Sequence, residues 1–105
     1  MTNRPTPLVT IGVAIYNESA YIDQALSSLR AQDYPRLEIV VCDNASTDGT
    51  LDICRAHAAE DPRIRIEAAA NNLGATTNFR RAKELASGEY FMWASGHDLW
   101  TPGLV

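Results

Sequence analysis

Two segments of the sequence carry side chains suited to binding a nucleotide or a metal ion. Asp43 directly follows the apolar run LEIVVC, where its carboxylate can accept a hydrogen bond from a base edge such as an imide N–H. The alternative is that Asp43 and Asn44 form an Asx-turn or cap a helix. His97 and Asp98 follow the apolar run YFMWA and offer nitrogen and oxygen ligands for a divalent cation. The alternative there is a turn in which Asp98 caps the next segment.

A third segment could bind phosphate. A helix is expected to begin near Gly74 and Ala75, and its N-terminus would present unpaired N–H groups and a positive dipole end to a diphosphate. Asn78, with the neighbouring threonines at 76 and 77, could add side-chain donors. Arg80, Arg81 and Lys83 form a basic cluster on the same helix, and the alternative for this cluster is a solvated helix face.

The hydrophobic pattern predicts the elements that hold these segments. Apolar or alternating runs predict strands at 8–15, 37–42, 63–68 and 90–94, the third nearer the sheet edge. Helical spacing predicts helices at 18–31, at 50–59 and from 74 or 75 onward. Because the connections are too long for hairpins, we expect parallel strands, right-handed crossovers and helices on both faces. The fold class is α/β, a Rossmann-like three-layer α/β/α arrangement with a mainly parallel four-stranded sheet.

Local signals predict where these helices begin and end. Asn17 or Ser19 is expected to cap the first helix, and Ser46, Thr47 or Asp48 the second. For the third helix we expect an apolar stripe and a glycine at C′. The residues concerned are Phe79, Ala82, Leu85, Ala86 and Gly88. Ligands of such sheets bind beyond the carboxyl ends of the strands, which brings the three segments described above together.

Composition limits the classes of protein that fit. With 105 residues and 46% hydrophobic composition, the chain can form one small α/β core, taken as a single domain of residues 1–105. A net charge of −4 argues against a nucleic acid partner. Cys42 and Cys54 lack paired spacing and are expected to be small buried hydrophobes, as suits a reducing cytoplasm. Apolar runs are far shorter than the ~20 residues of a membrane helix, so we expect a soluble protein.

Several motifs in order resemble the N-terminal half of the family 2 glycosyltransferases. They are YNE at 16–18, AQDYP at 31–35, DNASTDGT at 43–50, the N-x-x-G pattern at 71–74 and GEYFMW at 88–93. The resemblance implies a GT-A fold and inverting transfer from a nucleotide-diphospho-sugar, expected to be a UDP-sugar, to a hydroxyl of a carbohydrate or lipid-linked acceptor. It implies a cytoplasmic location, either free or peripheral to the inner face of a membrane.

The resemblance also implies site residues. Asp43 would read the imide of the base, and Tyr16, Asn17 and Glu18 would line the base and ribose pocket. The expected nucleotide-binding residues are Tyr16, Asn17, Glu18, Asp43, Asn44, Ser46, Gly74 and Asn78. Phe79 stands where many members have arginine, so Asn78 or Arg80 would take over phosphate contacts.

One motif of the family is altered in this chain. The Asp-x-Asp motif that ends the fourth strand and holds Mg²⁺ or Mn²⁺ falls on Ser95-Gly96-His97, followed by Asp98. His97 and Asp98 are then the expected metal ligands, and an imidazole ligand shifts the preference toward Mn²⁺. A one-residue slip would instead place Asp98 alone at the metal.

The family's catalytic base is an Asp or Glu well past this motif, so we expect it beyond Val105 and leave it unassigned. The expectation is a truncated donor-binding portion, inactive alone, that forms a homo-oligomer through apolar surface at Trp93 and Trp100. The main alternative is a non-catalytic or degenerate nucleotide-sugar-binding module. A Rossmann oxidoreductase is disfavoured because AIYNES lacks the required glycines, and a receiver-type module because only Glu18 is acidic after the first strand.

Overall fold

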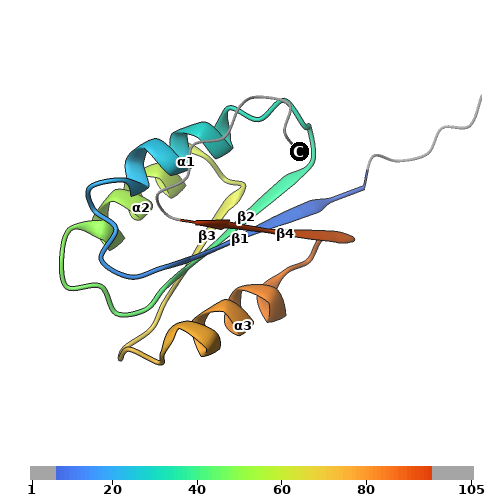
Figure 1. Ribbon diagram of the computed structural model, residues 1–105. Helices are drawn as coiled ribbons and strands as arrows, with labels where there is room; N and C mark the ends of the chain where they lie inside the picture. The colour runs from blue at the N-terminus through green and yellow to red at the C-terminus, as the bar shows by residue number, and fades with distance from the viewer. Residues whose placement is uncertain (1–6, 96–105) are drawn as a thin grey trace, which may run out of the picture.

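The computed structural model describes residues 7–95 and contains four strands and three helices in strict alternation (Figure 1). The elements are β1 (Val9–Ile15), α1 (Ile22–Arg30), β2 (Leu37–Asp43), α2 (Thr50–Glu60), β3 (Ile64–Ala68), α3 (Ala75–Leu85) and β4 (Tyr90–Ser95). All strand pairs are parallel, and the strand order is β3-β2-β1-β4. The predicted fold class, element order and edge position of the third strand are confirmed.

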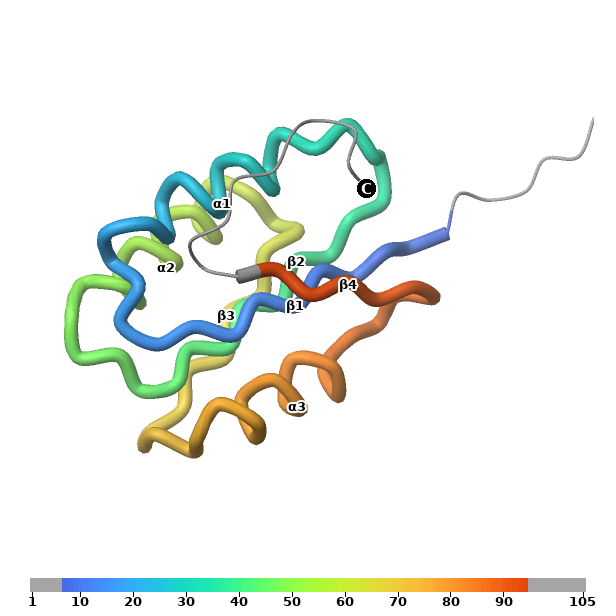
Figure 2. Tube along the Cα trace, viewed as in Figure 1, coloured from blue at the N-terminus to red at the C-terminus, as the bar shows by residue number. Residues whose placement is uncertain are grey.

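The sheet separates two helical layers of unequal size. Helices α1 and α2 cover one face and α3 covers the other (Figures 1 and 2). Side chains alternate along a strand, so Ile11 and Val13 of β1 point into the large core with α1 and α2. Val40 and Cys42 of β2 belong to a second, smaller cluster with Ala82 of α3. This two-sided burial explains why the first two strands read as continuous apolar runs.

The apolar stripe predicted for α3 is wrong at Phe79, whose side chain is 42% exposed. Asn78 and Ala82 are the buried residues of this helix. Asn78 is tolerated there because its Nδ2 donates to the Cys42 carbonyl at 2.8 Å. Phe79 lies one position round the helix and packs edge-on against Trp93 of β4, with 4.9 Å between ring centroids. The buried face of α3 therefore includes a polar residue that the apolar pattern does not predict.

The predicted cap of α1 is also wrong. The residue before α1 is Tyr21, which makes no side-chain cap hydrogen bond. Asn17 and Ser19 instead bond the loop that follows β2, about thirty positions away in the sequence, through Thr47 and Asp48. The prediction failed because capping rules consider only residues close in the sequence, and these partners are far away in it.

The predicted ends of the other two helices are corrected as well. The N-cap of α2 is Gly49 and has no side-chain cap hydrogen bond, while Asp48 Oδ1, one residue earlier, accepts from the N–H of Thr50 at 3.0 Å. Gly88 is not at C′ of α3, because the C-cap is Ala86 in an extended conformation. Gly88 lies close to the first strand instead, where an added Cβ would be 2.7 Å from the Leu8 carbonyl oxygen.

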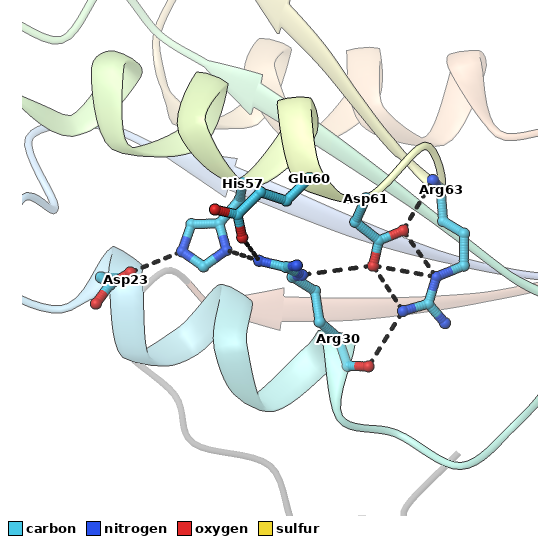
Figure 3. Close-up of polar contacts among 6 residues, drawn as sticks. All are labelled: Asp23, Arg30, His57, Glu60, Asp61 and Arg63. Carbon is cyan, nitrogen blue, oxygen red and sulfur yellow. Dashed lines mark hydrogen bonds and ion pairs between the residues drawn. The ribbon is translucent and has the colours of Figure 1, made fainter.

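A polar cluster joins α1 to α2 on the side away from the sheet (Figure 3). His57 is only 6% exposed; its Nε2 lies 2.7 Å from Asp23 Oδ1 and its Nδ1 lies 2.9 Å from Arg30 Nη1. An arginine only donates, so Nδ1 accepts and the Nε2–H donates to Asp23, which fixes the neutral tautomer. Asp61 pairs with Arg63 at 2.7 Å and with Arg30 at 3.5 Å. These hydrogen bonds and charges lower the pKa of Asp61 to about 2.

Both cysteines are buried and unbonded to each other, in line with the hydrophobic role predicted for them. Burial raises the pKa of Cys42, and burial together with the nearby charge of Asp43 raises that of Cys54 to about 12. Neither thiol is therefore a nucleophile at neutral pH. None of the helices within residues 7–95 is both long enough and apolar enough to cross a bilayer.

Candidate functional site

The loops that follow β1, β2 and β3 lie together at the carboxyl end of the sheet (Figure 2). The register requires this, because Ile15 of β1 is paired with Asp43 of β2, which is paired with Ala68 of β3. A cleft of about 230 Å³ opens at this end. Its lining residues are Ala14, Ile15, Tyr16, Glu18, Asn44, Asn72, Ala75, Asn78 and Phe79. The position of the cleft is the one that parallel α/β sheets use for ligands.

The cleft combines aromatic surface with amides and one carboxylate. Tyr16 is 44% exposed and Phe79 is 42% exposed, so both leave ring surface available to a ligand. Among the residues of 7–95 that line the cleft, Glu18 is the only charged one. Such a surface suits a flat, uncharged ring with polar edges, as a nucleobase has.

Four of the predicted nucleotide-binding residues line this cleft: Tyr16, Glu18, Asn44 and Asn78. The other four predicted residues are not in the cleft lining: Asn17, Ser46 and Gly74 lie in the three loops, and Asp43 is the last residue of β2. The predicted metal ligands His97 and Asp98 lie outside the described residues. Within 7–95, no group of three His, Cys, Asp or Glu residues could hold a metal ion.

Asp43 is buried, with 1% exposure, at the end of β2. Its Oδ2 accepts from the Ser46 N–H at 3.0 Å, and its Oδ1 accepts from the Ser46 hydroxyl. This is the local turn that the sequence offered as the alternative to a base contact. A carboxylate has about four acceptor sites, so these two bonds leave capacity for an imide N–H. The base contact stays a prediction.

Asn17 and Ser46 join the first loop to the second. Asn17 has a φ of 51°, a left-handed conformation that asparagine adopts more readily than most residues. Its Oδ1 accepts from the Thr47 N–H at 2.8 Å, and its N–H donates to Ser46 Oγ at 2.9 Å. Ser46 thus links Asp43 to Asn17, and these polar side chains shape the loops around the cleft.

Asn44 joins the second loop to the third. It is 3% exposed; its Oδ1 accepts from the Leu73 N–H at 2.7 Å and its Nδ2 donates to Asn72 Oδ1 at 2.9 Å. The same Asn72 oxygen accepts from the Gly74 N–H at 2.8 Å. Gly74 has a φ of 84°, which favours glycine, and it turns the chain into α3.

Sequence reasoning missed two kinds of residue. Asn72 and Ala75 line the cleft, and the N-x-x-G pattern before α3 was the available signal for them. Thr47 and Thr50 bond the first loop, and they lie inside the DNASTDGT motif, in which only Asp43, Asn44 and Ser46 were predicted to bind nucleotide. Their role depends on a loop far away in the sequence.

A larger cavity of about 510 Å³ lies between α1 and α2. Its ionisable lining residues, Asp23, Arg30, His57 and Glu60, are bonded to one another in the cluster of Figure 3. A ligand there would have to break those bonds, whereas the cleft at the sheet end presents exposed rings. We therefore take the cleft as the candidate site.

The family is decided by comparison with known proteins, since a family model described as glycosyl transferase family 2 matches residues 10–105. The chain belongs to glycosyl transferase family 2. The resemblance drawn from the motifs is thereby confirmed. The three-layer α/β/α fold matches solved GT-A glycosyltransferases.

Individual relatives of this family 2 chain are longer than it is. Chondroitin synthase of Escherichia coli is 35% identical over 105 residues, which are 99% of this chain and 15% of that protein. The mannosyltransferase PcManGT from Pyrobaculum calidifontis, solved in complex with GDP-Man and Mn²⁺, is 35% identical with a TM-score of 0.83 over 91% of this chain and 29% of its own. S. aureus TarS 1-349, solved with UDP-GlcNAc, is 29% identical with a TM-score of 0.81, over 88% and 27%.

Proposed function

We propose that the cleft binds the nucleotide part of a nucleoside-diphosphate sugar, specifically a UDP-sugar. In this proposal the chain is the donor-binding portion of an inverting glycosyltransferase that acts on a hydroxyl acceptor. The observation that carries it is the convergence of Tyr16, Glu18, Asn44 and Asn78 on one cleft at the carboxyl ends of parallel strands. The proposal draws support from PcManGT and TarS, whose structures contain GDP-Man and UDP-GlcNAc.

Each part of the cleft has a role in this proposal. The rings of Tyr16 and Phe79 pack against the base, and Asp43 or a cleft amide accepts its imide N–H. Ala75, the first residue of α3, lines the cleft, so the helix N-terminus directs free N–H groups and a positive dipole end toward a diphosphate.

These groups act on the leaving side of the reaction. In an inverting transfer a base deprotonates the acceptor hydroxyl, whose oxygen forms the new bond to the anomeric carbon as the bond to the diphosphate breaks. The N-terminus of α3 then stabilises the charge that develops on the diphosphate. A divalent cation, when bound, would add positive charge there. His97 and Asp98 stay its predicted ligands.

A second candidate function is nucleotide-sugar binding without transfer. It is favoured by one feature, the replacement of two expected acids by Ser95 and His97. Release of UDP from a UDP-sugar in the presence of acceptor, by the longest form of the protein that can be prepared, distinguishes transfer from binding alone.

Calorimetric titration with UDP and Mn²⁺ tests the binding proposal. Tyr16→Ala removes an exposed ring from the cleft, and we expect affinity to fall about tenfold, because stacking on one base is worth about 1–3 kcal/mol. The control is Tyr90→Ala, since Tyr90 is 61% exposed and begins β4 at the opposite end of the sheet. Absence of UDP binding by the native chain, or equal affinity in Tyr16→Ala, would overturn the proposal.

A further inference from the structure

We infer that Thr50 and Asp48 are positioning residues, which hold the backbone at Glu18 and thereby fix the wall of the cleft that carries Tyr16 and Glu18. The inference rests on the proposed function, because the property it explains is affinity for the nucleotide. It gives Asp48 and Thr50, in the second half of the DNASTDGT motif, a role that does not require either residue to touch the ligand.

A chain of three groups connects the cleft wall to α2. Thr50 is the first residue of α2 and is 0% exposed. Its Oγ1 accepts from the Glu18 N–H at 2.8 Å, and its hydroxyl donates to Asp48 Oδ1. A hydroxyl has a single hydrogen to donate, so donation to Asp48 leaves the Thr50 oxygen lone pairs directed at Glu18.

Asp48 completes the arrangement from outside the helix. Its Oδ1 also accepts from the Thr50 N–H at 3.0 Å, and its Oδ2 accepts from the Ser19 N–H at 3.2 Å. The Thr50 hydroxyl is the largest of several hydrogen bonds that lower the pKa of Asp48 to about 2. The carboxylate is therefore ionised at neutral pH, as a charge-assisted acceptor should be.

The Glu18 peptide is held on its other side as well. Its carbonyl accepts from the N–H groups of Tyr21 and Ile22, both at 2.9 Å, where α1 begins. Between the end of β1 and this point the chain has no regular structure, and Asn17 adopts the left-handed conformation. The Glu18 N–H bond to Thr50 thus holds the segment between β1 and α1 at the residue that lines the cleft, beside the bonds that Asn17 and Ser19 make to the loop after β2.

Two substitutions distinguish the effect of the Thr50 hydroxyl from the effect of the volume of its side chain. Thr50→Val keeps the shape of the buried side chain and removes the hydroxyl, while Thr50→Ser keeps the hydroxyl and removes a methyl group. If Thr50 only filled space, the serine variant would be the more damaged. If its hydroxyl positions Glu18, nucleotide affinity follows the hydroxyl.

The test is calorimetric titration of the whole chain with UDP and Mn²⁺, with thermal unfolding of each variant measured alongside. We expect Thr50→Val to weaken UDP binding about three- to tenfold, as the loss of one hydrogen bond implies, and Thr50→Ser to restore affinity to within about twofold of the native chain. Asp48→Ala lies outside the core and carries the same test if Thr50→Val unfolds below the titration temperature; the expected loss is the same.

The outcomes separate the two proposals. UDP affinity that is unchanged in Thr50→Val and Asp48→Ala overturns the positioning role and leaves the nucleotide site standing. Equal losses in Thr50→Val and Thr50→Ser also overturn it, because the hydroxyl would then not be the determinant. Failure of the native chain itself to bind UDP overturns the proposed function and the positioning role together.

Discussion

Most of the described hydrogen bonds of the polar side chains around the cleft are made to neighbouring loops. The amide oxygen of Asn44 accepts from the Leu73 N–H and its amide nitrogen donates to Asn72, while Ser46 connects Asp43 and Asn17. These residues were predicted from the sequence as ligand contacts. In the structure their described bonds hold the loops around the cleft, and the rings of Tyr16 and Phe79 stay exposed to a ligand.

Asn44→Ala tests how much the hydrogen bonds of Asn44 contribute to the stability of the fold. Asn44 is 3% exposed, and its loss leaves the Leu73 N–H without its partner, so we expect the free energy of unfolding to fall by about 1–3 kcal/mol. Urea unfolding measures it. Asn71→Ala, an exposed neighbour in the same loop, is the control and should change stability by less than about 0.5 kcal/mol. Equal effects of the two substitutions would contradict the role of Asn44.

The residue types at the site could be predicted, but their partners could not. A carboxylate after an apolar strand, as at Asp43, and an amide before a helix, as at Asn72, are visible in the sequence. The partner of Thr50 is Glu18, 32 positions earlier, and that pairing depends on strand register. The sequence offers both a turn and a ligand contact for Asp43, and the bonds from Ser46 to its carboxylate show that the turn is formed.

At the scale of elements, prediction succeeded where the chain's own periodicity decides the outcome. Continuous apolar runs gave β1 and β2, and i, i+3, i+4 spacing gave α1, whose buried residues include Ile22 and Leu26. The predicted stripe of α3 was wrong at Phe79, and it left out Asn78, a polar residue that is buried with a bond to the backbone of β2. Helix caps were wrong where a capping residue had a better partner in another loop.

Asp61, which pairs with Arg30 of α1 and with Arg63 before β3, makes the free energy of unfolding depend on pH in the acid range. Hydrogen bonds from Arg63, opposed by burial, lower the pKa of Asp61 from 3.8 to about 2. A carboxyl with a lowered pKa in the folded state stabilises the fold above its unfolded pKa, and that stability is lost as pH falls from about 4 through about 2. We therefore expect the free energy of unfolding to decline across this range.

Denaturant unfolding between pH 2 and pH 5 checks this dependence. Asp61→Asn should flatten the decline, and the exposed Asp33→Asn should leave it as in the native chain. A native chain whose stability stays constant over this range, or a decline that Asp61→Asn does not reduce, would contradict the assignment.

At the scale of the whole molecule, β4 is an edge strand, which pairs with only one neighbour in the described sheet. This strand is paired with β1, and its Trp93 is 42% exposed beside Phe79 and Phe91. Exposed apolar surface at a strand edge favours association between chains. The homo-oligomer expected from the sequence stays a prediction, and Trp93 is the described residue on which it depends.

Light scattering at high protein concentration measures this association. We expect a mass above that of one chain for the native protein and a shift toward monomer in Trp93→Arg. Tyr90→Arg, on the same strand and also exposed, is the matched control for added charge. A native chain that remains monomeric at high concentration would contradict the expectation.

The central claim is that loops after parallel strands converge on a single nucleotide site. Chemical-shift mapping of the ¹⁵N-labelled chain during titration with UDP and Mg²⁺ tests it most directly. We expect the largest changes at the cleft residues Tyr16, Glu18, Asn44, Asn72 and Asn78, and none in the α1–α2 cluster around His57. Changes centred on His57 and Arg30, or scattered over separate surfaces, would contradict it.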